Sequence, residues 1–243
     1  MIFAAGLGTR LAPLTDTCPK ALIDVGGRPM LERAVVAVRE AGATRVVVNV
    51  HHHAGMIIDF LAKSDFGVEI VVSDETERLL DTGGGVVKAH DLISDAGPVI
   101  LYNADIYTDL SLSDMVNEHI RSGADATLLV ADRATSRYLI FNQAGRMVGW
   151  TNRSTGEMRS PFALDDMASC RLLAFGGIHI VSPHVISDMV NYCPDGKFSI
   201  TTYYVDRCGQ FDFHSYLPAG RYNWIDIGKP DSLAKARKVA AEI

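Results

Sequence analysis

The sequence predicts an α/β fold: a Rossmann-like, mostly parallel mixed sheet with helices on both faces, plus a small β-rich segment. Apolar runs rich in β-branched residues alternate with helical patterns through the first half of the chain, as in parallel strands joined by helices. The connections are short, and no Gly-, Ser- or Pro-rich linker is long enough to separate two domains. With 243 residues, 48% of them hydrophobic, the chain can build one domain around a sizeable core.

The periodicity of the first half predicts its strands and helices in order. Residues 1–5 are a short apolar run that stops at a glycine, and they form the first expected strand. Residues 29–42 place apolar side chains at helical spacing from Leu31 to Val38 and end on Gly42, a natural helix stop. The same reasoning predicts strands over residues 45–50, 68–74, 98–105 and 125–132, and helices over residues 54–64, 84–94 and 111–123.

The pattern changes near residue 133. Residues 138–150 predict a hairpin around the turn residues Asn142 to Gly145. Further on, the sequence predicts a strand over 171–183, helices over 184–192 and 199–208, and a strand, a loop and a closing helix over 220–243. The first strand is short for the centre of a sheet, which leaves two explanations open: the strand ends early, or residues precede Met1 in the natural protein.

Composition and charge exclude several classes of protein. The formal net charge of −6 argues against a nucleic-acid partner, which requires a positive field. The four cysteines form no zinc pattern and are expected to be free thiols in a reducing compartment. No apolar run reaches the roughly 18 residues of a membrane span, and no signal peptide is visible. We therefore expect a soluble cytoplasmic protein with no nucleic-acid or membrane partner.

A glycine-rich loop follows the first predicted strand, within residues 4–22. Gly6 and Gly8 lie at the carboxyl end of that strand, where open α/β sheets bind ligands. Glycines there let the backbone approach a phosphate and direct N–H groups at it. A dinucleotide loop would open straight into a helix, but Leu11 takes the third glycine position and Pro13 follows, and the P-loop pattern is absent. The glycines alone fit either a phosphate loop or a plain turn.

Two cations extend this loop. Arg10 follows Thr9, and Lys20 follows Pro19. Two positive charges beside a glycine loop suit a polyphosphate better than a nicotinamide. The string G-x-G-T-R-L-x-P-L-T, followed by P-K, resembles the signature of the sugar-1-phosphate nucleotidylyltransferases, which join a sugar phosphate to a nucleoside triphosphate and release pyrophosphate.

The resemblance covers nearly the whole chain and implies substrates, a cofactor and residue roles. The implied partners are a nucleoside triphosphate and a sugar 1-phosphate, the implied cofactor is Mg²⁺, and the implied catalytic residues are Arg10, Lys20 and Asp105. The expected nucleotide-binding residues are Ala5, Gly6, Gly8, Thr9, Arg10, Gly83, Gly84 and Asn103; the expected sugar-binding residues are Gly176, Gly177 and Lys197; the expected metal ligands are Asp105 and Asp226. Within a single domain over 1–243, residues 1–132 would bind the nucleotide, and residues 133–243 would bind the sugar and supply the closing helix, without the C-terminal β-helix of larger relatives.

Three segments farther along the chain contain further expected site residues. The run from Thr82 to Gly85 opens a predicted helix and is either a capped turn or a wall without side chains for a flat base. Asp105 ends a predicted central strand and so faces the ligand crevice, where a carboxylate can hold Mg²⁺. The order W-x-D-x-G around Asp226 resembles the family's distal motif, although Lys229 departs from its commoner threonine.

The implied reaction is attack of a sugar 1-phosphate oxygen on the α-phosphorus of the nucleoside triphosphate. The best match to the compact family members is UTP with N-acetylmuramate 1-phosphate. The alternatives are GTP with mannose 1-phosphate, UTP or dTTP with glucose 1-phosphate, and CTP with phosphocholine. Two readings of another class are a non-catalytic nucleotide-sensing subunit and an NAD-dependent oxidoreductase. We expect a monomer or small homo-oligomer, and we do not expect residues 51–53, three adjacent histidines, to share one metal ion.

Overall fold

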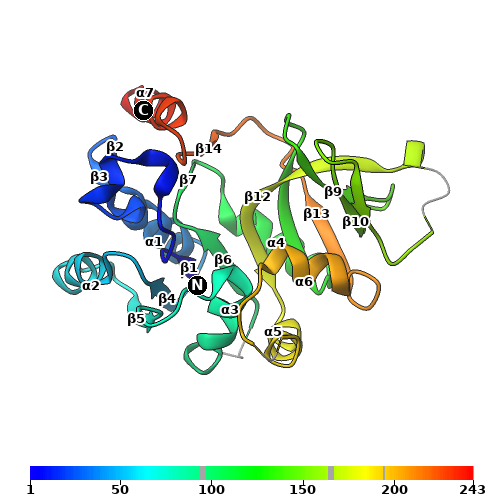
Figure 1. Ribbon diagram of the computed structural model, residues 1–243, viewed down its shortest axis with the longest axis horizontal. Helices are drawn as coiled ribbons and strands as arrows, with labels where there is room; N and C mark the ends of the chain where they lie inside the picture. Colours follow the sequence, from blue (N-terminus) through cyan, green and yellow to red (C-terminus); the bar gives the residue numbers. More distant parts are fainter. Residues whose placement is uncertain (94–96, 164–166, 194, 243) are drawn as a thin grey trace.

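A computed structural model describes residues 1–93, 97–163, 167–193 and 195–242 (Figure 1). The strands are β1 (Ile2–Phe3), β2 (Asp24–Val25), β3 (Arg28–Pro29), β4 (Arg45–Val50), β5 (Glu69–Asp74), β6 (Val99–Asn103), β7 (Ile106–Thr108), β8 (Ala126–Ala131), β9 (Arg137–Phe141), β10 (Met147–Asn152), β11 (Glu157–Arg159), β12 (Arg171–Val181), β13 (Phe213–Tyr216) and β14 (Trp224–Asp226). The α-helices are α1 (Met30–Glu40), α2 (Ala54–Lys63), α3 (Asp81–Lys88), α4 (Leu112–Ser122), α5 (Pro183–Val190), α6 (Ile200–Arg207) and α7 (Pro230–Ala241).

One ten-stranded sheet joins the two halves of the chain. Its main path runs β11-β10-β9-β12-β6-β1-β4-β5, and β8 and β13 extend it beside β12. The strands β1, β4, β5 and β6 are parallel, whereas β12 runs antiparallel to β6, β8 and β9. The sheet is therefore mixed, as the sequence predicted, with parallel pairing among β6, β1, β4 and β5 and antiparallel pairing around β12. Strand β13 pairs in parallel with β8.

Helices cover both faces of the sheet. Apolar side chains of α1, α2 and α4 pack on one face in a cluster that includes Leu31, Ile57 and Met115. Side chains of α3, α5 and α6 pack on the other face, where Val86 and Tyr203 belong to a second cluster. Because strands such as β4 and β8 are buried on both faces, they read in the sequence as continuous apolar runs.

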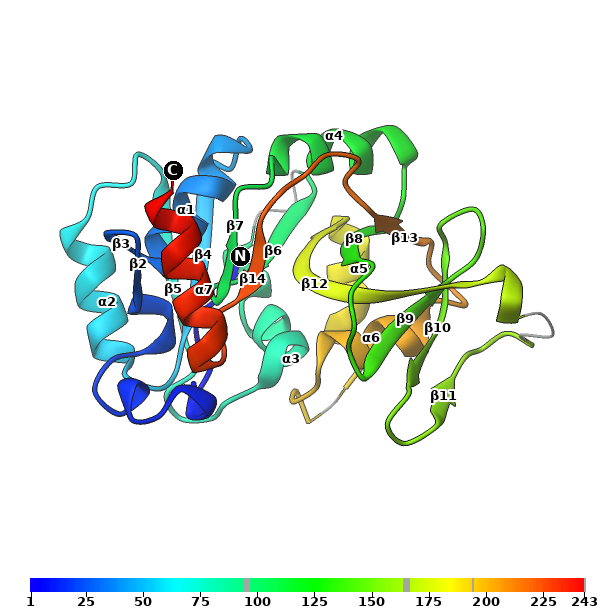
Figure 2. The same ribbon diagram turned by 90° about the horizontal axis from the view of Figure 1, so that it is seen from above.

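The C-terminal segment returns to the N-terminal half. Strand β14 pairs with β7, and α7 packs on β14 and β2 (Figure 2). A third apolar cluster joins Leu11 and Val25 near the start of the chain to Ile225, Ile227 and Leu233 near its end. This return places the distal aspartate motif beside the loop that follows β1.

Most predicted elements are confirmed. The sequence did not predict the short strands β2, β3 and β11, and three further differences concern longer elements. The helix expected over 84–94 is α3, which begins three residues earlier at Asp81; part of that prediction, 94–96, lies outside the described residues. The strand expected over 98–105 divides into β6 and β7, since the chain turns at the polar pair after β6. Strand β13 was not predicted, because its residues Phe213–Tyr216 show no alternation of apolar and polar side chains.

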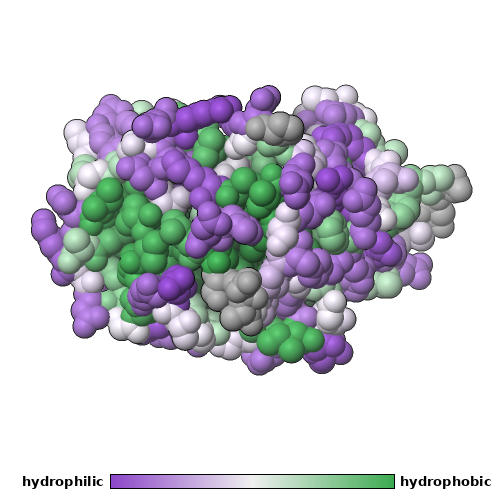
Figure 3. Space-filling model, turned by 90° about the horizontal axis from the view of Figure 1, so that it is seen from below, coloured by the Kyte–Doolittle hydropathy of each residue, from purple (hydrophilic) through white to green (hydrophobic). Residues whose placement is uncertain are grey.

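Apolar surface is not confined to cavities. Figure 3 shows hydrophobic residues gathered on the face of the molecule seen from below, beside hydrophilic ones. Among large hydrophobic residues, Met56, Ile58 and Ile120 are more than a third exposed. Within the described parts of the chain, no helix combines the length and apolar character needed to cross a bilayer.

A buried histidine in β12 makes stability depend on pH. His179 is 1% exposed, its Nδ1 lies 2.5 Å from the Tyr204 hydroxyl, and burial lowers its pKa from 6.5 to about 3. An unfolded histidine binds a proton near pH 6.5, so between these values the unfolded state holds more protons than the folded one. We expect this site to lower the free energy of unfolding by at most about 1.4 kcal/mol per pH unit as the pH falls from about 6 to 4. Urea unfolding at several pH values should show a shallower slope for His179→Asn; an unchanged slope would contradict the assignment.

Candidate active site

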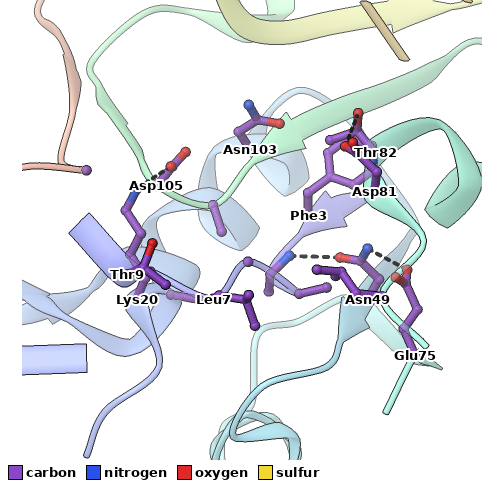
Figure 4. A pocket seen from close by; sticks show the side chains of 18 of the residues that line it. Phe3, Leu7, Thr9, Lys20, Asn49, Glu75, Asp81, Thr82, Asn103 and Asp105 are labelled. Carbon is purple, nitrogen blue, oxygen red and sulfur yellow. Dashed lines mark hydrogen bonds and ion pairs between the residues drawn. The ribbon is translucent and has the colours of Figure 1, made fainter. Parts of the chain in front are cut away.

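A cavity of about 510 Å³ lies at the carboxyl ends of the parallel strands (Figure 4). It is lined by the loop after β1, by the ends of β4 and β6, and by the segment before and at the start of α3. The lining residues are Phe3, Ala4, Ala5, Gly6, Leu7, Gly8, Thr9, Arg10, Lys20, Ala21, Asn49, Glu75, Leu79, Asp81, Thr82, Asn103, Ala104, Asp105, Lys197 and Gly228. This is the edge at which open α/β sheets bind ligands.

The loop after β1 is shaped by a glycine and a short turn. Gly8 has a φ of +67°, and a Cβ there would lie 2.9 Å from the Thr15 side chain. Its carbonyl accepts hydrogen bonds from Leu11 N at 2.9 Å and from Thr15 Oγ1 at 3.0 Å. Gly6 is exposed and has nothing within 4 Å of its Cβ position. The backbone of this loop is therefore fixed at Gly8 and open to a ligand at Gly6.

Four charged side chains meet at one end of the cavity. The Lys20 ammonium is paired with the Asp105 carboxylate and lies 3.5 Å from Asp226 Oδ1. The Arg10 guanidinium lies 3.9 Å from Asp226 Oδ2. Lys20 is held firmly, with 11% of its side chain exposed, whereas Arg10 reaches into solvent with 60% exposed. Arg10, Lys20 and Asp105 line the cavity, and Asp226 adjoins it through its contacts with Lys20 and Arg10.

Backbone pairing brings the two aspartates together. In the antiparallel pair of β14 and β7, Asp226 lies opposite Ile106, the residue after Asp105. The next residue, Ile227, donates its N–H to the Asp105 carbonyl at 3.0 Å. Gly228 then donates its N–H to Asp226 Oδ1 at 2.7 Å. The carboxylates are therefore positioned by a strand ladder and not by loop contacts alone.

Gly228 closes the charged cluster from one side. A Cβ at this position would lie 2.6 Å from Arg10 Nη2, 2.7 Å from Asp226 Oδ1 and 3.0 Å from Lys20 Nζ. Any side chain would therefore push the charged groups apart. Gly228 is the glycine of the W-x-D-x-G motif but was not among the predicted site residues.

The two aspartates form a donor set that suits a hard divalent cation. Asp105 and Asp226 both approach the Lys20 ammonium, so their carboxylate oxygens face a shared cation position. Mg²⁺ is commonly held by one or two carboxylates, with phosphate oxygens and water completing its shell. No group of three or more histidine, cysteine or acidic side chains able to hold a metal occurs among the described residues. The geometry fits a two-carboxylate site whose remaining ligands come from substrate.

A buried polar network forms the other end of the cavity. Asn49 Oδ1 accepts a hydrogen bond from Ala4 N at 2.8 Å, and Asn49 Nδ2 donates to Glu75 Oε1 at 2.7 Å. Glu75 Oε2 accepts from Leu80 N at 3.2 Å, and Glu75 is fully buried. The network ties the glycine loop to the segment before α3 (Figure 4). Neither Asn49 nor Glu75 was among the predicted site residues. The signals in the sequence were an asparagine inside the apolar strand 45–50 and an acidic residue directly after β5.

The glycines that open α3 do not reach the cavity. Gly83 and Gly84 are buried, and their N–H groups donate to the Phe198 carbonyl at 2.9 and 3.3 Å. A Cβ at Gly83 would overlap the Phe198 ring, and one at Gly84 would overlap the Gly196 carbonyl. These glycines let the segment around Phe198 pack onto α3, and their contact with a base stays a prediction. Asp81 and Thr82 line the cavity in their place.

The residues expected to bind the sugar lie in two different places. Lys197 is exposed and lines the cavity. The expected nucleotide-binding residues Ala5, Thr9 and Asn103 line it as well. Gly176 and Gly177 line no cavity described here; they lie where the pairing of β12 with β8 shifts register. Gly177 has a φ of +73°, and a Cβ there would lie 2.8 Å from Asn103 Nδ2. The bulge therefore backs the cavity wall, and direct contact of these glycines with a sugar stays a prediction.

The three adjacent histidines, residues 51–53, have different surroundings. His51 Nδ1 lies 2.6 Å from the Glu75 carbonyl oxygen. His53 has a φ of +53° at the start of α2, and its ring centroid lies 3.9 Å from that of His52. The histidines do not converge on a single metal position.

Comparisons with known proteins agree with this geometry. Residues 1–140 match the family described as nucleotidyl transferase. The N-acetylmuramate alpha-1-phosphate uridylyltransferase of Caulobacter vibrioides is 29% identical over 100% of this chain and 96% of its own length. The mannose-1-phosphate guanyltransferase of Schizosaccharomyces pombe is 30% identical over 95% of this chain, which spans 61% of that relative. A putative glucose-1-phosphate thymidylyltransferase structure from Bacillus anthracis, in complex with a sucrose, covers 100% of this chain and 94% of its own, with a TM-score of 0.82 at 21% identity, and shows the same fold.

Proposed function

This chain belongs to the nucleotidyl transferase family and to its sugar-1-phosphate nucleotidyltransferase class, and we propose that it transfers a uridylyl group from UTP to N-acetylmuramate 1-phosphate. One observation supports this activity above all: two cations and two carboxylates lie together beside the glycine loop. They belong to Arg10, Lys20, Asp105 and Asp226. The choice of substrates is supported by the Caulobacter relative, which matches over nearly its full length. The guanyltransferase of Schizosaccharomyces pombe is longer, and this chain spans 61% of it.

In the proposed reaction, an oxygen of the sugar 1-phosphate attacks the α-phosphorus, and pyrophosphate leaves. The amides of the loop from Gly6 to Thr9 would bind the triphosphate, and Arg10 would hold the departing pyrophosphate through its planar fork of donors. Lys20 would offset the charge of the attacking and attacked phosphates. Since the reactants are both anions, positioning and charge neutralisation supply most of the rate enhancement, and no covalent enzyme intermediate is required.

The aspartates would supply the cofactor site. Asp105 and Asp226 would hold Mg²⁺, which when bound would neutralise phosphate charge. For this arrangement Lys20 must give up part of its pairing with the two carboxylates and turn toward the phosphates. Its four-carbon stem allows that movement without a change of backbone.

Base and sugar can be tested in one experiment. Purified protein is mixed with each of four nucleoside triphosphates and each of several sugar 1-phosphates, with and without Mg²⁺, and pyrophosphate release is measured. We expect the highest kcat/KM for UTP with N-acetylmuramate 1-phosphate and little release without the metal. A preference for GTP with mannose 1-phosphate would show that the proposed substrates are wrong and that the enzyme class is right. Nucleotide binding with no pyrophosphate release on any pair would instead favour a nucleotide-sensing subunit.

A further inference from the structure

A second cavity of about 530 Å³ lies in the antiparallel half of the molecule. It is formed between the strands β9, β10 and β11 and the start of α6. Its lining residues are Arg133, Thr135, Arg137, Tyr138, Leu139, Trp150, Asn152, Glu157, Arg159, Phe175, Ser199, Thr201, Thr202 and Val205. The combination of aromatic rings, hydroxyls, an amide and three arginines is typical of a polar ligand site with a charged anchor. The proposed function has used none of these side chains.

The register of the three strands sets the arginines in rows. Asn152 lies opposite Arg137 on one side and Glu157 on the other. Trp150 lies in the next row, opposite Leu139 and Arg159. Because residues two apart share one face of a strand, both rows face the same side of the sheet. The charged and aromatic side chains of this cavity are therefore fixed by backbone pairing.

The cavity carries an excess of positive charge in an acidic protein. Three arginines face one acidic residue, Glu157, while the whole chain has a net charge of −6. Arg159 is neutralised by Asp206, whose Oδ1 lies 2.5 Å from its Nη2. Arg137 has no ion pair with any side chain of the described residues. The guanidinium of Arg137 is thus free to bind an anion.

A third arginine connects this cavity to the charged cluster of the active site. Arg133 donates from Nη2 to the Phe175 carbonyl at 3.0 Å, and its guanidinium lies 4.3 Å from the centre of the Trp224 ring. Its Nε is buried and has no partner within the described part of the chain. Trp224 belongs to β14, the strand that ends at Asp226. A substrate whose phosphate lies at Asp226 can therefore extend past Arg133 toward Arg137.

From this arrangement we propose that the second cavity binds a carboxylate carried by the sugar, with Arg137 as its principal ligand and Arg133 as a second donor. The inference rests on the proposed function, because it assigns the far end of the same sugar phosphate. A guanidinium matches a carboxylate with two parallel hydrogen bonds, which a neutral sugar hydroxyl cannot do. Trp150, on the same face as Arg137, offers a flat apolar surface for the sugar ring.

A matched pair of substrates tests the proposal. N-acetylmuramate 1-phosphate and N-acetylglucosamine 1-phosphate differ by the lactyl ether that carries the carboxylate. For the wild-type protein we expect kcat/KM to be at least 10-fold higher for the acidic sugar. Arg137→Ala should lower kcat/KM for the acidic sugar by about 10- to 100-fold, as expected when a hydrogen-bonded charge pair is removed. It should leave the value for the neutral sugar within about 2-fold, and Arg137→Lys should restore part of the loss.

The control is Arg171→Ala, which removes one exposed arginine of β12 outside both cavities and should change neither substrate's kcat/KM. Calorimetric titration of the wild type and Arg137→Ala with both sugar phosphates gives a readout independent of turnover. Equal use of both sugars by the wild type, or an equal effect of Arg137→Ala on both, would overturn the carboxylate assignment and leave the transferase intact. Tighter binding of glucose 1,6-bisphosphate than of the acidic sugar would assign the cavity to a phosphate. If no sugar phosphate releases pyrophosphate, the proposed function fails, and the titrations alone decide the cavity.

Discussion

Lys20→Met is expected to lower kcat for pyrophosphate release by at least about 10²–10³-fold, the usual loss when a group aimed at transition-state charge is removed. Methionine keeps most of the length of the side chain and removes its charge. The Lys20 ammonium is the cation that contacts both carboxylates of the site, so no neighbouring group occupies its position. The measurement is steady-state pyrophosphate release with UTP and N-acetylmuramate 1-phosphate at saturating Mg²⁺.

The matched control is Lys63→Met, which removes an exposed lysine at the end of α2 and should leave kcat unchanged. A thermal melt of each variant separates lost chemistry from lost folding. We expect Lys20→Met to melt no lower than the wild type by more than a few degrees, since the site without substrate gains little from a partly exposed ion pair. Near-normal turnover of a folded Lys20→Met protein would show that Lys20 has no part in the reaction.

Asp105→Asn is expected to lower kcat by a similar factor, about 10²–10³-fold, and to weaken divalent-ion binding. The change keeps the shape of the side chain but removes the charge that faces both Lys20 and the shared cation position. Binding of Mn²⁺, measured by the loss of its free-ion paramagnetic resonance signal, gives a readout separate from turnover. Asp226→Asn should weaken Mn²⁺ binding in the same direction, because the two carboxylates share one position.

Asp59→Asn on the exposed side of α2 provides the control for charge alone and should alter neither kcat nor Mn²⁺ binding. If Asp105→Asn bound Mn²⁺ as tightly as the wild type, Asp105 would not be a metal ligand. If only Asp226→Asn lost the ion, the shared site would have to be replaced by one built on Asp226.

The sequence by itself determined the features that depend on neighbouring residues. The strands β4 and β8 follow from continuous apolar runs, and α4 follows from its helical spacing, its Ser111 cap and the glycine after it. The glycine loop with Arg10 and Lys20 is also local, since its residues lie within one stretch of chain. Such features can be predicted from the sequence because hydrophobic periodicity and turn preferences depend on residues only a few positions apart.

Only the tertiary structure decided which distant residues meet. The position of Asp226 beside Asp105 depends on the pairing of β14 with β7, and the Asn49–Glu75 network depends on β4 lying next to β5. The role of Gly83 as a packing site for Phe198 likewise depends on a segment from the other half of the chain. The physical reason is that long-range contacts are selected by the burial and hydrogen bonding of the whole sheet, which no short stretch of sequence encodes.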